Sequence, residues 1–215
     1  MNQHKPLYSA PDKHLSLLGI PFDLAAGEPG AVMGPAALRA VGLAQSLTDL
    51  GYTVDDHGDI AAPEPIAVNI PEGIRGHYLN HVAAWTRAIH DRTYDLLQLQ
   101  HPIIFSAAII PSLWVLSAPL HRHCRAIKKN LVVLWLDAHA DFNTLHTTLS
   151  GNMHGMPVAF LTGEVDMTPL LGEGRPAIPV KPSNFYLFGL RSIDADERRL
   201  LEERRINPDR YAYDR

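Results

Sequence analysis

Segments typical of strands alternate along the chain with segments whose apolar residues recur at helical spacing. The predicted strands lie at residues 14–22, 52–60, 101–105, 131–136 and 185–190. The predicted helices lie at residues 35–50, 74–100, 155–162 and 195–205, and the Gly- and Pro-rich stretch 172–184 is expected to be a surface loop. This alternation favours a mainly parallel sheet covered on both faces, a three-layer α/β/α fold. Because no linker interrupts the pattern, we expect a single domain over residues 1–215.

The strand predicted at 131–136 leads into Asp137, His139 and Asp141, which are spaced two residues apart. Side chains with this spacing on a strand point to the same side. Open parallel sheets bind their ligands at the carboxyl ends of their strands. Two carboxylates and an imidazole at such a place favour a divalent ion such as Mn²⁺. Taken alone the motif is short, and solvated aspartates beside a hydrogen-bonded histidine explain it equally well.

Composition narrows the classes of partner. The net charge of −4 gives no reason to expect nucleic acid or an acidic membrane surface, and it is compatible with a cationic substrate. A single cysteine, Cys124, excludes an internal disulfide. Together with an N-terminus that lacks the pattern of a signal peptide, it indicates a cytoplasmic protein. The uncharged stretch 103–120 is interrupted by Pro111 and Pro119, which argues against a membrane span.

The residues that follow the motif carry a family resemblance. The string Asp137-Ala-His-Ala-Asp-Phe-Asn-Thr144, followed by Ser150-Gly-Asn-Met-His-Gly-Met-Pro157, resembles the signature of the ureohydrolase family, with the arginases as the most similar branch. The strings Gly30-Ala-Val-Met-Gly-Pro-Ala-Ala-Leu-Arg39 and Gly189-Leu-Arg-Ser-Ile-Asp-Ala-Asp-Glu197 are similar to other arginase segments. The resemblance covers roughly residues 14 to 205 and is most specific at 137–157.

This resemblance implies an arginase-like fold and the hydrolysis of L-arginine to L-ornithine and urea. In the family, a pair of Mn²⁺ ions holds a hydroxide that attacks the guanidinium carbon of the substrate. Such a pair of ions lowers the pKa of water and stabilises the charge that develops in the tetrahedral intermediate. The resemblance also implies a homo-oligomer, commonly a trimer or a hexamer.

The resemblance further implies which residues bind metal and move protons. Asp137, His139 and Asp141 are expected to be metal ligands, with Asp137 bridging the two ions. His154 is expected to carry protons to the leaving amine, a task that suits a side chain titrating near neutrality. The plainer alternative for His154 is a backbone contact at the start of a helix.

Polar residues around the motif match family positions that contact the amino-acid part of the substrate. The positions for the α-carboxylate are Asn143, Thr148, Ser150 and Asn152, the position for the α-amino group is Asp194, and Glu197 lies one helical turn further on, towards the cationic end. Residues of these types also form caps and turns in most proteins, so a purely local role is the alternative. Contacts to a carboxylate favour arginase over agmatinase, whose substrate lacks that group.

The stretch from Phe105 to Leu116 departs from the family pattern. Arginases carry Gly-Gly-Asp-His-Ser after the third strand, and its histidine binds one metal, whereas this chain has no histidine and no glycine pair there. Codons that encode Phe105 to Leu116 can be chosen so that another reading frame spells Leu-Gly-Gly-Asp-His-Ser-Ile-Ala-Val-Gly-Thr. We therefore hypothesise that roughly residues 105–128 are translated out of frame.

The sequence given ends at Arg215, before the later Ser-x-Asp-x-Asp strand that supplies two further metal ligands in the family. We expect the C-terminal strands of the sheet to be missing, which leaves unpaired edges and exposed apolar surface. With an incomplete set of metal ligands, this chain is expected to have little or no activity. Two alternatives stay open: a non-catalytic arginase-like fragment that binds an amino acid, and a sibling ureohydrolase acting on agmatine or formiminoglutamate.

Overall fold

The computed structural model describes residues 13–24, 27, 29–69, 76–99, 101–107, 116–166 and 168–206. The strands are β1 (His14–Ile20), β2 (Thr53–Asp59), β3 (Ile103–Ala107), β4 (Val133–Leu136) and β5 (Phe185–Phe188). The α-helices are α1 (Gly34–Ala40), α2 (Leu43–Asp49), α3 (Leu79–Leu97), α4 (Ser117–Ala126), α5 (Pro157–Thr162), α6 (Thr168–Leu171) and α7 (Ala195–Arg204). Short 3-10 turns lie at Ala31–Met33, Met153–Gly155 and Pro182–Asn184.

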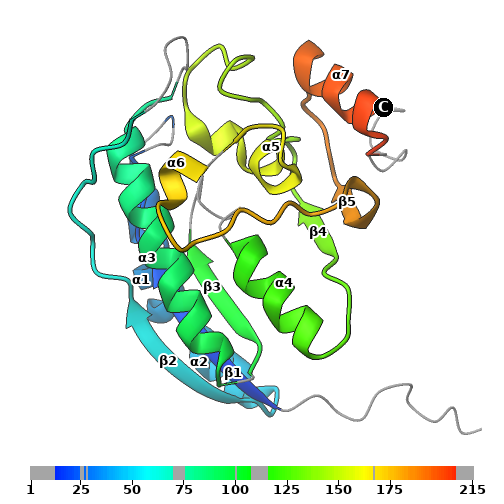
Figure 1. The fold of residues 1–215 in the computed structure, drawn as a ribbon. Helices are drawn as coiled ribbons and strands as arrows, with labels where there is room; N and C mark the ends of the chain where they lie inside the picture. The colour runs from blue at the N-terminus through cyan, green and yellow to red at the C-terminus, as the bar shows by residue number, and fades with distance from the viewer. Residues whose placement is uncertain are drawn as a thin grey trace, which may run out of the picture.

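All strand pairings among the described residues are parallel. Strand β1 lies between β2 and β3, and β4 pairs with β5. The central strand β1 is apolar and buried along nearly its whole length, as expected of a strand with neighbours on both sides and both faces covered. Helix α3 passes in front of this sheet, and α1 and α2 lie behind it (Figure 1). The predicted α/β fold with a mainly parallel sheet is therefore confirmed.

The core forms where α3 and α5 meet the segment that follows β4. Pro157 begins α5, at a position where a backbone N–H would have no partner within the helix. The helix is buried from Pro157 through Leu161. In α3, Trp85 packs against Phe22, with 5.2 Å between ring centroids. The Val158 N–H donates to the Asp141 carbonyl at 3.0 Å. Helix α5 thus ties the predicted metal motif directly to the core.

One face of the β4–β5 pair is apolar and open to solvent. Side chains alternate along both strands, so that Leu187 is buried whereas Leu134 and Leu136 are 62% and 77% exposed. Tyr186 and Phe188, which pair with these two leucines, are exposed on the same face. The prediction of a sheet covered on both faces is therefore wrong for this pair, and the expected exposed apolar surface is confirmed.

Several predicted boundaries also need correction. The helix predicted at 35–50 is two short helices, α1 and α2, because Gly42 between them adopts a left-handed conformation with φ of +84°. The stretch 172–184 is not wholly a surface loop, since Val180 is buried and its N–H donates to the Leu161 carbonyl at 2.7 Å. The helix predicted at 74–100 is α3, while residues 74 and 75 lie outside the described residues. The apolar pattern does not predict α4 or α6.

No helix in the described part of the chain is long and apolar enough to cross a membrane. The uncharged stretch 103–120 contains β3 and the start of α4, and its residues 108–115 lie outside the described residues. The hypothesis of a changed reading frame over 105–128 falls partly on these residues, so it stays a prediction.

Replacement of Gly163 by alanine is expected to destabilise the end of α5. Gly163 has a φ of +81°, and a Cβ there would lie 2.8 Å from the Pro179 side chain. Gly174 is a matched control because its φ is +77° and a Cβ there meets nothing within 4 Å. The left-handed backbone costs each alanine variant about 1–2 kcal/mol, and the clash adds about 1–3 kcal/mol for Gly163→Ala alone. Urea unfolding measures both, and equal losses would show that the contact with Pro179 relaxes freely.

Candidate active site

The chain leaves strand β4 at Asp137 through a tight turn. The Asp137 N–H still pairs with β5, donating to the Phe188 carbonyl at 3.2 Å. Its carboxylate then accepts the His139 N–H at 2.9 Å, an aspartate turn that bends the backbone. Strand β4 therefore ends at Leu136, and the prediction that Asp137, His139 and Asp141 continue it as a strand is wrong. The imidazole of His139 is 64% exposed and lies 3.3 Å from the Asp137 carboxylate.

Asp141 occupies the most unusual electrostatic position of the motif. Its φ of +47° is left-handed, a conformation that is uncommon for non-glycine residues but more accessible to aspartate than to most. Burial raises the pKa of its carboxyl to about 7, the negative charges of Asp137 and Glu197 push the pKa the same way, and His139 opposes them. A cation bound beside these carboxylates would relieve both the desolvation and the repulsion.

The donor set of the motif fits a divalent metal by the chemistry of its ligand atoms. Oxygen from two carboxylates and nitrogen from one imidazole suit Mn²⁺. Within the described residues, the ligand atoms of Asp137, His139 and Asp141 do not all lie within 4.8 Å of one another. Their mutual electrostatic influence at Asp141 shows that they are neighbours.

The loop after the motif is held together by its own hydroxyl and amide groups. Asn143 accepts the Thr147 hydroxyl at 2.8 Å and donates its side-chain amide to the Asp194 carboxylate at 2.6 Å. The buried Thr148 accepts the Gly151 N–H at 3.0 Å. The structure therefore brings Asn143 and Asp194 together, although 51 residues separate them. The hydroxyl of Thr148 is part of the turn between Thr148 and Gly151.

Ser150, Asn152 and His154 follow on the same loop. The Ser150 hydroxyl accepts the Asn152 N–H at 3.2 Å, and the Ser150 carbonyl accepts a hydrogen bond from the His77 ring at 2.9 Å. A Cβ at Gly27 would lie 3.6 Å from the Asn152 amide and 3.9 Å from the His154 ring. Gly27, which follows β1 in the chain, therefore lies beside the Asn152 and His154 side chains.

Glu197 binds helix α7 to the motif loop. Asp194 caps the helix by accepting the Glu197 N–H at 2.9 Å, and Glu197 accepts the Asp194 N–H in return at 3.1 Å. The second oxygen of Glu197 accepts the Phe142 N–H at 2.9 Å. Burial raises the pKa of the Glu197 carboxyl, and the hydrogen bonds from the Phe142 and Asp194 N–H groups act against that rise. In this arrangement both oxygens of Glu197 contact backbone.

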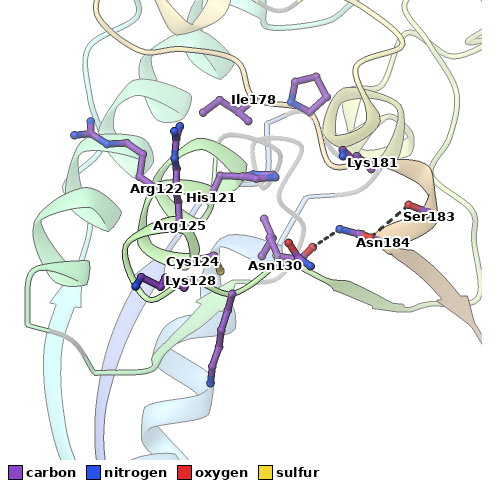
Figure 2. A pocket seen from close by; sticks show the side chains of 13 residues that line it. His121, Arg122, Cys124, Arg125, Lys128, Asn130, Ile178, Lys181, Ser183 and Asn184 are labelled. Carbon is purple, nitrogen blue, oxygen red and sulfur yellow. Dashed lines mark hydrogen bonds between the residues drawn. The ribbon is translucent and has the colours of Figure 1, made fainter.

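A separate cavity of about 680 Å³ lies at the amino-terminal ends of β4 and β5, away from the motif (Figure 2). Its lining includes residues that precede the two strands, whereas the motif follows β4. The positive groups around it are Arg122, Arg125, Lys128, Lys129 and Lys181. A cavity with this charge repels both divalent cations and guanidinium compounds, so the motif region is the better candidate for a site of that kind.

Comparison with known proteins identifies the family. Residues 13–209 match the arginase family. The chain belongs to the arginase family. It is 38% identical over 196 residues to the arginase of Agrobacterium fabrum, and the alignment covers 89% of this chain and 58% of that protein. It is 34% identical over 193 residues to the arginase of Bacillus subtilis, covering 89% of this chain and 62% of that protein.

The solved structures of arginases agree with this assignment. The arginase of Bacillus cereus matches with a TM-score of 0.78 and 28% identity, over 92% of this chain and 63% of that one. An arginase structure from Bacillus subtilis matches with a TM-score of 0.75 and 32% identity, over 92% of this chain and 63% of that one. The chain therefore spans about three fifths of the length of the arginases that it matches. The predicted resemblance to the arginase family is confirmed.

Two residues that support the site region, Thr147 and His77, were not predicted from the sequence. The Thr147 hydroxyl donates a hydrogen bond to the Asn143 side chain. His77 bonds the loop twice: its ring contacts the Ser150 carbonyl, and its backbone N–H donates to the Gly151 carbonyl at 2.9 Å. The three threonines within the five residues from Thr144 to Thr148 were a usable signal for Thr147. His77 gave no comparable signal, because nothing in its neighbourhood in the sequence relates it to a loop so far along the chain.

Proposed function

We propose that this chain carries part of the active site of an arginase, which hydrolyses L-arginine to L-ornithine and urea. The observation that carries the proposal is the partly buried carboxyl of Asp141, whose pKa rises to about 7 beside Asp137 and Glu197. Electrostatic strain of this kind is typical of a cation or catalytic site. It lies in a chain of the arginase family, at the motif that resembles the family signature.

Asp137, His139 and Asp141 are the residues that would hold the metal, and we propose that the metal is Mn²⁺. A divalent metal pair would supply an activated water and would stabilise the charge that develops in the tetrahedral intermediate. His154, beside Asn152 on the 3-10 turn Met153–Gly155, would move a proton to the leaving amine.

The proposed contacts to the amino-acid end of L-arginine come from the loop and from helix α7. Asn143 and Ser150 would receive the α-carboxylate, and Asp194 would receive the α-amino group. Their hydrogen-bond network supports this division, since Asn143 and Asp194 already lie 2.6 Å apart. Thr148, Asn152 and Glu197 make local hydrogen bonds, so for these three we propose support of the loop together with substrate contact. By family resemblance we also propose a cytoplasmic homo-oligomer, a trimer or a hexamer.

Arginine turnover by this chain alone is expected to be at least about a hundredfold slower than that of an ordinary arginase, because the stretch from Phe105 to Leu116 lacks the histidine that binds one metal in the family. Urea release with saturating Mn²⁺ and L-arginine measures it. The arginase of Bacillus subtilis, assayed in parallel, is the positive control, and Asp141→Asn gives the background rate. Turnover within tenfold of the control would contradict the expected impairment. Activity on agmatine or formiminoglutamate but not on arginine would overturn the choice of substrate.

Binding of an amino acid without turnover is the second candidate function. The observation that favours it is the intact Asn143–Asp194 contact in a chain that lacks the family's histidine ligand between Phe105 and Leu116. Calorimetry with L-ornithine tests it, and agmatine, which lacks the carboxylate, is the matched control ligand. Binding of ornithine but not of agmatine, lost in Asn143→Ala, supports this function. Equal heats for both ligands would contradict it.

Sequencing of the gene across codons 100–130 tests the hypothesis of a changed reading frame. A frame that restores Gly-Gly-Asp-His-Ser would supply the histidine ligand that Phe105 to Leu116 lacks. An unchanged sequence would reject the hypothesis and leave the metal site without that ligand.

A further inference from the structure

A second group of potential metal ligands lies at the amino-terminal edge of the first sheet. His14 begins β1, Asp55 lies on β2, and His101 stands two residues before β3. The register explains why they meet. Position 16 of β1 pairs with position 55 on one side and 103 on the other. Residue 14 therefore lies diagonal to residue 55 and level with residue 101, and positions two apart on a strand share a face.

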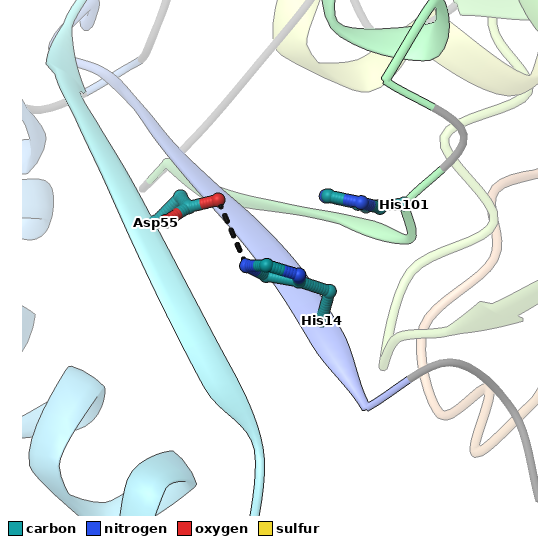
Figure 3. A group of neighbouring side chains, drawn as sticks. All are labelled: His14, Asp55 and His101. Carbon is teal, nitrogen blue, oxygen red and sulfur yellow. Dashed lines mark ion pairs between the residues drawn. The ribbon is translucent and has the colours of Figure 1, made fainter.

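The three side chains are close enough to share one ion. One ligand atom from each of His14, Asp55 and His101 lies within 4.8 Å of the other two. The His14 Nε2 lies 3.2 Å from the Asp55 carboxylate, and the two imidazole rings stack with 4.3 Å between centroids and 9° between planes. Figure 3 shows His14 in the middle, with Asp55 at one end and the His101 ring above it.

We propose that His14, Asp55 and His101 form a binding site for a divalent transition metal of the Zn²⁺ class, separate from the arginase motif. Two imidazoles and one carboxylate are a common ligand set for Zn²⁺ and leave a position for water. A site richer in nitrogen than the motif binds Zn²⁺ more tightly than Mn²⁺, in keeping with the general order of affinities for divalent metals. The two sites therefore differ in the ion that they prefer.

The location supports a site that is rigid in its backbone and adjustable in its side chains. Three neighbouring strand segments supply the ligands, so the sheet hydrogen bonds fix their spacing. The side chains of His14 and Asp55 are 34% and 48% exposed, which gives an ion access from solvent. Stacked imidazoles must rotate before their nitrogens can approach one ion at about 2.0–2.1 Å. The exposure of His14 leaves room for that rotation.

The proposed ion would act as a clamp between strands. It would join β1 to β2 and to the segment that enters β3, at the end of the sheet opposite to the carboxyl ends of these strands. Because it binds the folded sheet and not the separated segments, it would stabilise the fold in proportion to its concentration. This role does not depend on the proposed arginase activity.

Calorimetry with ZnCl₂ and with MnCl₂ on the metal-stripped full chain tests the proposal. All titrations are made in a His139→Gln background, which removes the imidazole of the motif. We expect one Zn²⁺ isotherm at least about tenfold tighter than that of Mn²⁺. His14→Gln, His101→Gln and Asp55→Asn should each weaken Zn²⁺ binding by at least about tenfold, the loss typical of disturbing a ligand set. The matched control is His90→Gln, which alters a histidine–aspartate pair on α3.

A second measurement guards against variants that fold poorly. The melting temperature of the full chain should rise with Zn²⁺ and should not rise in His101→Gln, while circular dichroism shows that both proteins are folded. Absence of Zn²⁺ binding in the His139→Gln background would overturn the proposal. So would an isotherm that stays unchanged in His14→Gln and His101→Gln.

Discussion

Replacement of Asp141 by asparagine should stabilise the metal-free protein at pH 8 and abolish the proposed binding of Mn²⁺. In the folded chain the pKa of the Asp141 carboxyl is about 7 instead of 3.8, with burial as the first cause and the charge of Asp137 as the second. At pH 8 this carboxyl is charged in a place that disfavours charge. Asparagine has nearly the same shape and carries no charge, so it removes the penalty together with a proposed metal ligand.

The sign of the pH dependence follows from linkage. A carboxyl whose pKa is raised by folding holds its proton more tightly in the folded state than in the unfolded state. Its contribution to stability is fully present below pH 3.8 and is lost as the pH rises through about 7. The difference between the two pKa values corresponds to at most about 4 kcal/mol, because one pKa unit is about 1.36 kcal/mol. Relative to the wild type, Asp141→Asn should gain little below pH 4 and most above pH 7.

Urea unfolding of both proteins between pH 3.5 and 8.5, in the presence of a chelator, measures this gain. The exposed Glu173→Gln is a control that removes one negative charge far from the motif in sequence, and it should shift stability by less than about 0.5 kcal/mol at any pH. Addition of Mn²⁺ at pH 8 should raise the melting temperature of the wild type but not that of Asp141→Asn. A constant difference between wild type and variant across the pH range would show that Asp141 is not strained by its neighbours.

The predicted conflict at Asp141 indicates where stability and function oppose each other. The negative charges of Asp137 and Glu197 both act against ionisation of the Asp141 carboxyl. Nothing in the packing of α5 or α7 requires Asp141 to be acidic, since it is the Asp141 backbone that bonds Val158. A charged side chain that a neutral one could replace with a gain in stability is best explained by a bound ligand.

The fold was readable from sequence where a segment is buried on both sides. Strand β1 and helix α3 lie close to their predicted bounds because continuous burial and helical spacing leave clear patterns. The break at Gly42 was harder to predict, since glycine next to a helical pattern is compatible with either a kink or a cap. The open face of β4 also could not be read from its residues alone, because an apolar strand looks the same whether both faces are covered or one.

The residue types of the candidate site were predictable, and their geometry was not. The sequence places Asp137, His139 and Asp141 at the end of a strand, but the aspartate turn that bends the chain depends on a hydrogen bond within the motif itself. The contact of Asn143 with Asp194 depends on how β5 and α7 return to the motif, which is a property of the whole fold. The ligand group around His14 follows from sheet register, which no local pattern reveals.

Replacement of Glu197 by alanine should destabilise the chain by about 2–4 kcal/mol and loosen the motif loop. Glu197 is only 6% exposed and accepts two backbone N–H groups, from Asp194 in the capping box and from Phe142 next to Asp141. Loss of the capping contact costs about 1 kcal/mol. A Phe142 N–H left buried without a partner costs a further 1–3 kcal/mol or so. At about 2–4 °C per kcal/mol for a chain of this size, the melting temperature should fall by roughly 5–15 °C.

The local effect distinguishes this role from general destabilisation. Hydrogen exchange of the Phe142 amide should accelerate in Glu197→Ala more than that of core amides in α3, because the lost bond protects that amide directly. Glu197→Gln keeps one acceptor oxygen and should lose about half as much stability. Glu203→Ala, on the same helix with an exposed side chain paired to Arg199, should change stability by less than about 0.5 kcal/mol. If Glu197→Ala were no worse than Glu203→Ala, the bond from Phe142 would not hold α7 to the motif, and Glu197 would be free to serve a ligand instead.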